Sequence, residues 1–166
     1  MPSDRLRVLE ERTRYQPSDV EPRVFARWED AGVFHAEPEG DATETFSIAV
    51  PPPNVTGVLH MGHALNGSIQ DALIRLARMR GKRAKWIFGT DHAGIATQVK
   101  VEQALAEEGL TRHDLGREAF VERVWEWRRD HGSQITAQFR KLGASLDYSD
   151  ERFTMDDSYA AAVQKV

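Results

Sequence analysis

Apolar positions in the first third of the chain follow two different spacings, one typical of a helix and one of a strand. Val24, Phe25 and Trp28 fall on one side of a helix that the pattern predicts over residues 20–31. The next apolar run, residues 46–50, is short and rich in β-forming residues, and three prolines follow it at once. Because proline cannot donate to a sheet ladder, this run predicts a strand that ends there.

Segments with helical spacing and segments with strand-like spacing continue to alternate through the middle of the chain. Apolar residues recur at helical spacing from about residue 60 to residue 80, and the run 84–88 predicts a second strand. An amphipathic helix then reaches about residue 108, and a capping box at 111–114 precedes a long helix over 117–142. The apolar positions of the first of these helices, expected to face the sheet, are Ala64, Leu65, Ile69, Ala72, Leu73, Leu76 and Ala77.

The remaining patterns are weaker. Residues 1–17 are charged and are interpreted as a lead-in, residues 144–153 are expected to be irregular, and Asp156 is expected to cap a last helix. Trp125 and Trp127 are two residues apart on the long helix, so one is expected to be buried and the other partly exposed. The order strand, helix, strand, helix is typical of a parallel α/β sheet, in which ligands bind beside the carboxyl ends of the strands.

Composition narrows the class of protein. Of the 166 residues, 40% are hydrophobic and 29% are charged, which is typical of a soluble globular chain. The net charge of −4 does not indicate a surface dedicated to nucleic acid, and the lack of cysteine excludes disulfides and cysteine zinc sites. No stretch resembles a signal peptide or approaches the roughly 20 apolar residues of a membrane span, so we expect a cytoplasmic protein without a membrane partner.

The first candidate site is the segment 51–63. Its three prolines stiffen the exit from the strand, and Gly57 is expected to allow a close approach or a positive φ. His60 and His63 stand three residues apart at a helix start, where both rings share one side, and Gly62 leaves no side chain to block a ligand. Imidazole donors beside a helix N-terminus suit a polyphosphate. Two surface histidines without a function are the plainer interpretation, and a zinc pair is disfavoured because no glutamate follows the first histidine.

The second candidate site is the segment 89–98, which follows the second predicted strand. Two glycines flank Asp91 and His92 at another helix start. The carboxylate of Asp91 is suited to a charge-assisted hydrogen bond from a ligand ammonium group, and the alternative is that Asp91 only caps the helix. Trp86, on the strand itself, is expected to lie in the core.

Residues 60–63, His-Met-Gly-His, resemble the HIGH signature of the class I aminoacyl-tRNA synthetases. The run 51–57 before it and the Gly-Thr-Asp-His-Ala-Gly run at 89–94 are similar to the forms that valyl-tRNA synthetases have at these places. Residues 142–156 also resemble this family, and the likeness extends from about residue 14 to the end of the chain.

The resemblance implies both a fold and a function. The fold would be the first half of a Rossmann-like parallel nucleotide-binding sheet with flanking helices, incomplete as it stands, with residues 18–166 as the N-terminal half of the catalytic domain. The reaction would be ATP-dependent activation of valine to valyl-adenylate, followed by transfer to tRNA(Val). The Lys-rich KMSKS signature, the editing domain and the anticodon-binding helices have no match here, so we expect a fragment with weak activity at best.

The resemblance also implies residue roles, position by position. The ATP-binding residues would be Thr56, Gly57, His60, Gly62 and His63, of which the two histidines would be catalytic. The valine-binding residues would be Pro52, Pro53, Asn54 and Asp91, with Asp91 holding the α-ammonium group. His92 and Gln98 are assigned only to the surroundings of the site. Mg²⁺ is implied by the ATP chemistry, and no residue is assigned to a metal.

Two other functions stay open at this point. A small nucleotidyltransferase with the same His-x-Gly-His signature, such as a pantetheine-phosphate adenylyltransferase, would match poorly outside residues 60–63 and would lack the run 89–94. Such enzymes also start with a strand, whereas this chain is expected to start with a helix. A non-catalytic module derived from a synthetase is the second alternative.

Overall fold

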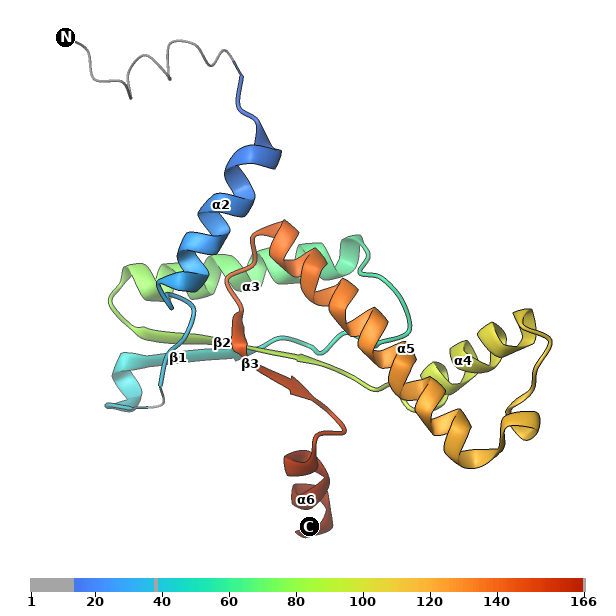
Figure 1. Cartoon of the computed structure of the whole chain (residues 1–166). Coiled ribbons are helices and arrows are strands. Elements are labelled where there is room, and N and C mark those ends of the chain that lie inside the picture. The colour runs from blue at the N-terminus through green and yellow to red at the C-terminus, as the bar shows by residue number, and fades with distance from the viewer. Residues whose placement is uncertain (1–13, 38, 166) are drawn as a thin grey trace.

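A three-stranded parallel sheet forms the centre of the molecule (Figure 1). The computed structural model describes residues 14–37 and 39–165. The strands are β1 (Thr45–Ala49), β2 (Arg83–Thr90) and β3 (Asp147–Phe153), and they lie in the order β1-β2-β3. The predicted parallel α/β class is confirmed.

Helices precede, connect and follow the strands. They are α2 (Pro17–Asp30), α3 (Met61–Met79), α4 (Ile95–Glu107), α5 (Arg112–Leu142) and α6 (Asp157–Lys165), with a short 3-10 helix, η1 (Ala42–Glu44), before β1. Helix α2 starts at Pro17, the last residue of the predicted lead-in, and proline suits the first helical turn. Residues 1–13 of that lead-in lie outside the described residues. No helix among the residues described is both long and apolar enough to cross a membrane.

The long helix α5 has the two parts that the sequence predicts. Thr111 accepts a hydrogen bond from the N–H of Asp114 in a capping box, and Gly116 then departs from helical geometry, with φ 76° and ψ 171°. A regular helix continues from there to Gly143, whose φ of 78° is the left-handed value that favours glycine at a helix end.

The core lies between one face of the sheet and the helices α3 and α5, which Figure 1 shows on the same side. Trp86 and Phe88 of β2 are completely buried, as are Ile74 of α3 and Ile135 of α5. The indole N–H of Trp86 donates to Gln70 Oε1 at 2.9 Å, so its one polar group is satisfied. The predicted core position of Trp86 is confirmed.

Helix α3 packs on the sheet with a different side from the one predicted. Leu65 is 65% exposed and Ile69 is 57% exposed, although both were expected to face the sheet. The buried residues of this helix are Gly67, Ile74 and Ala77, and of these only Ala77 belongs to the predicted set. The helix has apolar residues on more than one side, so apolar spacing alone does not define which side packs.

β3 is the largest departure from the prediction, because residues 144–153 were expected to be irregular. They contain a strand that pairs with β2, although its register is uneven. Ile87 of β2 lies opposite Asp147, and Gly89 lies opposite Arg152, so that residues 148–151 face a single residue of β2. A strand with such a bulge shows no regular alternation of apolar and polar residues, and the sequence therefore carries no strand signal here.

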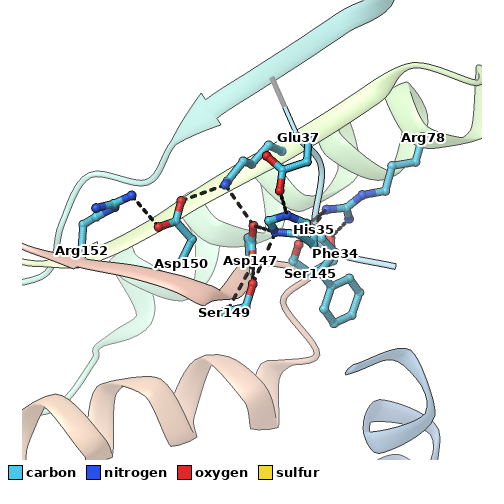
Figure 2. A network of polar contacts seen from close by, with 10 residues as sticks. Phe34, His35, Glu37, Arg78, Ser145, Asp147, Ser149, Asp150 and Arg152 are labelled. Carbon is cyan, nitrogen blue, oxygen red and sulfur yellow. Dashed lines mark hydrogen bonds and ion pairs between the residues drawn. The ribbon is translucent and has the colours of Figure 1, made fainter. Parts of the chain in front are cut away.

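A network of polar contacts holds β3 against β2 (Figure 2). The side chain of Asp147 is only 2% exposed, and its Oδ2 atom lies 2.8 Å from His35 Nδ1 and 3.2 Å from Lys85 Nζ. Its Oδ1 atom accepts from the N–H and the hydroxyl of Ser149. Burial by itself would raise the pKa of Asp147, but the hydrogen bonds from Ser149, His35 and Lys85 hold this pKa below its ordinary value. Asp147 is therefore a buried, charged carboxylate with partners from three segments.

Candidate functional site

A cavity of about 400 Å³ opens where β1 ends and α3 begins. We call it the site cavity. It is lined by Val50, Pro51, Pro52, Pro53, Asn54, Thr56, Gly57, Val58, His60, Gly62, His63, Asn66, Gly67 and Phe139. Every residue predicted to bind ATP is in this set, and so are three of the four predicted to bind valine. The exception is Asp91.

The two histidines meet at the start of α3, as predicted. His60 is the N-cap residue, and its Nδ1 atom accepts a hydrogen bond from the N–H of Gly62 at 3.0 Å. The Nδ1 atom of His63 accepts from the N–H of His60 at 3.1 Å. The ring centroids are 4.0 Å apart, so both imidazoles lie on the same side of the first turn.

These contacts determine which ring nitrogen carries the proton. A neutral imidazole whose Nδ1 accepts a hydrogen bond carries its proton on Nε2. Among the described residues, neither Nε2 atom has a hydrogen-bond partner, so both N–H groups are available as donors. Burial, and then the neighbouring His60, lower the pKa of His63, which favours its neutral form. The helix start thus offers two neutral donors where the helix dipole already favours an anion.

The structure shows what glycine does for the conformation of the chain at two positions of this segment. A Cβ atom at Gly62 would lie 2.8 Å from Cε1 of His60, so glycine is needed to let that ring form its hydrogen bond. The expected positive φ at Gly57 is wrong, whereas a close approach of a ligand there stays a prediction, and a Cβ at this position would meet no atom of the chain within 4 Å. The missing side chain of Gly57 instead keeps this wall of the site cavity open.

Backbone hydrogen bonds join the two candidate sites. The N–H of Val50 donates to the carbonyl oxygen of Ile87 at 3.0 Å, which extends the pairing of β1 with β2 past the strand end. Further along, the N–H of Asp91 donates to Pro53 O at 2.9 Å, and the N–H of Val55 donates to Asp91 O at 3.0 Å. Asp91 is therefore directly beside the first candidate segment, although its side chain does not line the site cavity.

The carboxylate of Asp91 is not a helix cap. The N-cap residue of α4 is Gly94, which makes no side-chain capping bond, so the capping interpretation of Asp91 is wrong. Asp91 Oδ1 accepts from the N–H of Ala93 at 3.1 Å and from the hydroxyl of Thr154 at 2.9 Å. The side chain is 34% exposed, which leaves the carboxylate accessible to a ligand.

Two residues at the site, Thr154 and Asn66, were not predicted from the sequence. The Thr154 hydroxyl, which donates to Asp91, also accepts from the N–H of His92 at 2.9 Å, and it comes from the turn after β3. Asn66 lines the site cavity one helical turn after His63, and this spacing is a signal from which it could have been predicted. Gln98, assigned to the surroundings, donates to Glu102 within α4.

Comparisons with known proteins agree with this geometry. A family model described as tRNA synthetases class I (I, L, M and V) matches residues 23–166. The chain is 57% identical over 153 residues to a valine--tRNA ligase of Caulobacter vibrioides and 58% identical over 153 residues to one of Nitratidesulfovibrio vulgaris. Each match covers 92% of this chain and 17% of the relative, so the chain spans about a sixth of the length of these curated relatives.

The fold also resembles a solved structure. The LeuRS of Agrobacterium radiobacter, in a ternary complex described as LeuRS-tRNA-LeuAMS, matches with a TM-score of 0.72 and 20% sequence identity. The match covers 92% of this chain and 18% of that chain. At this level of identity the likeness supports the arrangement of helices and strands.

Proposed function

The chain belongs to the class I tRNA synthetases, and we propose that its site binds ATP and valine as part of a valine--tRNA ligase. The observation that carries the proposal is the pair of neutral imidazole N–H donors that His60 and His63 place on the site cavity. The identity of 57–58% to valine--tRNA ligases supports valine as the amino acid.

The proposed reaction begins with the attack of a valine carboxylate oxygen on the α-phosphorus of ATP. The bond from this phosphorus to the pyrophosphate oxygen breaks, which gives valyl-adenylate and pyrophosphate. Negative charge builds on the phosphate oxygens during the displacement, and the Nε2–H groups of His60 and His63 are placed to stabilise it. The ribose hydroxyl at the 3′ end of tRNA(Val) then takes the valyl group, and AMP leaves.

We assign ATP to the side of the site cavity formed by the start of α3. Phosphate oxygens favour a helix N-terminus because unpaired backbone N–H groups and the helix dipole attract anions. Thr56, Gly57 and Gly62 have small side chains, so a phosphate can approach the main chain there. This supports the five predicted ATP-binding positions as one group.

We assign valine to the side of the cavity near Asn54. Pro52, Pro53 and Asn54 line this side, and the backbone pairing of Val55 with Asp91 brings the carboxylate close. An ammonium group is positively charged and only donates hydrogen bonds, whereas a carboxylate is negatively charged and only accepts them, so the two form a strong charge-assisted hydrogen bond. We therefore propose that Asp91 holds the α-ammonium group of valine.

The described residues provide no ligand set for a metal. No group of three or more His, Asp or Glu residues in the described ranges is arranged to hold an ion. Mg²⁺ therefore stays a prediction from the chemistry of ATP. The contacts with tRNA(Val), the cytoplasmic location and the division of the chain at residue 18 also stay predictions.

The small nucleotidyltransferase is not favoured as an alternative. The family model matches residues 23–166, and the curated relatives match 92% of the chain, far beyond the His-x-Gly-His signature. A non-catalytic module would have the same fold, and only a functional measurement separates it from an enzyme.

Binding of stable adenylate analogues tests the proposal. The purified chain would be titrated calorimetrically with the sulfamoyl-adenosine analogues of valyl-, isoleucyl-, leucyl- and methionyl-adenylate. We expect the valyl analogue to bind most tightly, and we expect His60→Ala and His63→Ala to weaken it. Equal affinity for all four would overturn valine as the amino acid, and lack of binding by any of them would favour the non-catalytic module.

Catalysis is tested in a chimera, because the chain spans 17% of its relatives. In what we call the chimeric ligase, residues 14–165 replace the matching segment of the Caulobacter vibrioides enzyme. We expect valine-dependent exchange of pyrophosphate into ATP. An inactive chimera that is folded and still binds tRNA would contradict a catalytic role for this segment.

A further inference from the structure

Helix α5 contacts the loop between β1 and α3 at two points outside the site cavity. From these contacts we propose that Trp127 and Gln138 are positioning residues, which hold residues 55–59 so that His60 presents its ring correctly. The inference rests on the proposed function for its chemical meaning. Neither side chain lines the site cavity, so both would act through the main chain of the loop.

Trp127 holds the first end of the loop. Its indole N–H donates to the carbonyl oxygen of Val55 at 2.8 Å, and Val55 is 1% exposed. The indole is stacked on His131, with centroids 3.8 Å apart and the rings 13° from parallel. His131 is itself bonded through Nδ1 to the carbonyl oxygen of Trp127 at 3.0 Å. The indole therefore has a fixed orientation. Trp125 and Trp127 are both half-buried, so the prediction that one is buried and the other partly exposed is wrong.

Gln138 holds the second end of the loop. Its Oε1 atom accepts from the N–H of Leu59 at 2.8 Å, and Leu59 is the residue directly before His60. Gln138 lies three helical turns after Trp127, which places both side chains on the same side of α5. The residues between the two contacts, 56–58, line the site cavity.

The link from this loop to the chemistry runs through one main-chain group. The N–H of His60 donates to His63 Nδ1, so the position of the His60 backbone also orients the second ring. A shift at Leu59 is passed directly to His60 through the peptide bond between them. Donors that act on a transition state lose much of their effect when displaced by about 1 Å. We therefore expect loss of the Gln138 contact to lower kcat more than it changes KM for ATP.

Amide hydrogen exchange in the full chain tests the mechanical part of the proposal without any ligand. Gln138→Met removes the acceptor and keeps the length of the side chain, Gln138→Glu keeps an acceptor, and Gln134→Met is a control at an exposed position of the same helix. We expect Gln138→Met to speed exchange at Leu59, His60 and Gly62 about tenfold, the effect of one lost hydrogen bond. The other two variants should stay close to wild type.

The catalytic part is measured in the chimeric ligase. Gln138→Met should lower kcat of pyrophosphate exchange about tenfold with KM for ATP changed less than about twofold, and Gln138→Glu should restore most of the rate. Trp127→Phe, which keeps an aromatic ring and loses the donor, should have the same pattern. It also serves as the second variant if Gln138→Met does not fold.

The outcomes separate this inference from the proposed function. Unchanged exchange at His60 and Gly62 in both Gln138→Met and Trp127→Phe would overturn the positioning role, and so would faster exchange with an unchanged kcat. If the wild-type chimera does not activate valine, the proposed function fails. The exchange data alone then decide whether α5 holds the loop.

Discussion

Two polar regions flank β2, and they use their hydrogen bonds differently. Beyond β1, His60 is exposed and its ring accepts from a main-chain N–H of its own helix turn. In β3, the carboxylate of Asp147 is only 2% exposed and accepts from His35, Lys85 and Ser149. The first region leaves a nitrogen for a ligand, whereas the second uses both carboxylate oxygens within the chain.

The difference separates residues that we propose bind a ligand from residues that hold the fold. A buried charge needs several partners to offset its lost hydration, and those partners tie distant segments together. An exposed imidazole that hydrogen-bonds to the main chain stays hydrated, so it needs few partners, and its second nitrogen stays available to a ligand. Changes in the β3 network should therefore reduce stability, and changes at the start of α3 should reduce activity.

The largest expected effect is on stability, at Asp147. Asp147→Ala leaves Lys85 and His35 without their buried partner, and we expect the free energy of unfolding to fall by about 3–5 kcal/mol. Asp150→Ala in the same strand is the control, since its side chain is 31% exposed and its contacts with Lys85 and Arg152 lie nearer to solvent. We expect a loss below about 1 kcal/mol there. Urea denaturation followed by circular dichroism measures both, and equal losses would remove the distinction between the two regions.

Next is the loss of a histidine donor. His60→Ala or His63→Ala in the chimeric ligase should lower valine-dependent pyrophosphate exchange by about 10²–10³-fold, the effect of one lost transition-state donor. The free energy of unfolding should change by about 1 kcal/mol or less, because only a cap at an exposed helix start is lost. His113→Ala, an exposed histidine in the first turn of α5, is the control. Wild-type exchange rates in the double variant would contradict the phosphate assignment.

Asp91 should affect the amino acid and leave ATP unaffected. Asp91→Asn keeps the shape of the side chain and removes its charge, so KM for valine should rise by the equivalent of about 1.5–3 kcal/mol. Steady-state exchange at varied valine and varied ATP measures the two constants separately. Asp130→Asn, at an exposed position of α5, should change neither. If KM for ATP alone rises, Asp91 belongs to the nucleotide side of the site.

Two glycines extend the comparison to the main chain. A Cβ at Gly89 would lie 2.7 Å from the carbonyl oxygen of Arg152, so Gly89→Ala should push β3 away from β2 and cost about 1–3 kcal/mol. A Cβ at Gly57 would meet nothing within 4 Å, and Gly57→Ala should change stability by less than about 0.5 kcal/mol. Thermal and urea unfolding of the two variants side by side provide the test, and a larger loss at Gly57 would show that the loop is packed more tightly than the structure indicates.

The smallest expected effect is a pH dependence of stability that arises in the β3 network. Hydrogen bonds with Glu37 and then with Asp147 raise the pKa of His35. A raised folded-state pKa adds stability below the unfolded value of about 6.5, and this stability is lost as the pH rises through the folded value. The urea midpoint should therefore fall modestly above about pH 6.5. His63, whose pKa is lowered, has the opposite effect: it adds stability as the pH rises through the unfolded value of about 6.5, so it offsets part of the fall expected from His35.

The matched variant for this pH effect is His35→Gln, which keeps a hydrogen-bonding side chain and cannot titrate. Its urea midpoint should no longer fall over the same pH range. A wild-type midpoint that rises with pH, or a variant that keeps the wild-type slope, would contradict the assignment to His35.

The site was more predictable from sequence than the sheet was. His60 and Gly62 lie two residues apart at a helix start. Their relative positions are therefore set by the geometry of a single helix turn, which the sequence predicts. The partner of Asp91 was not predictable, because Thr154 is 63 residues away and threonine is common in turns. β3 was missed for a different reason. Asp147 is a buried charged residue that pairs with Lys85, and a search for alternating hydrophobic residues does not detect a buried charge.

The ring of His60 also limits which residues can replace it. One nitrogen must accept from the N–H of Gly62 while the other donates outward, so the position needs an acceptor and a donor on a single rigid group. Lysine has the donor without the acceptor, and aspartate has the acceptor without the donor. A chain whose ring carried its proton on the wrong nitrogen would also lose the helix cap. Folding of this turn therefore selects the tautomer that the proposed phosphate contact requires.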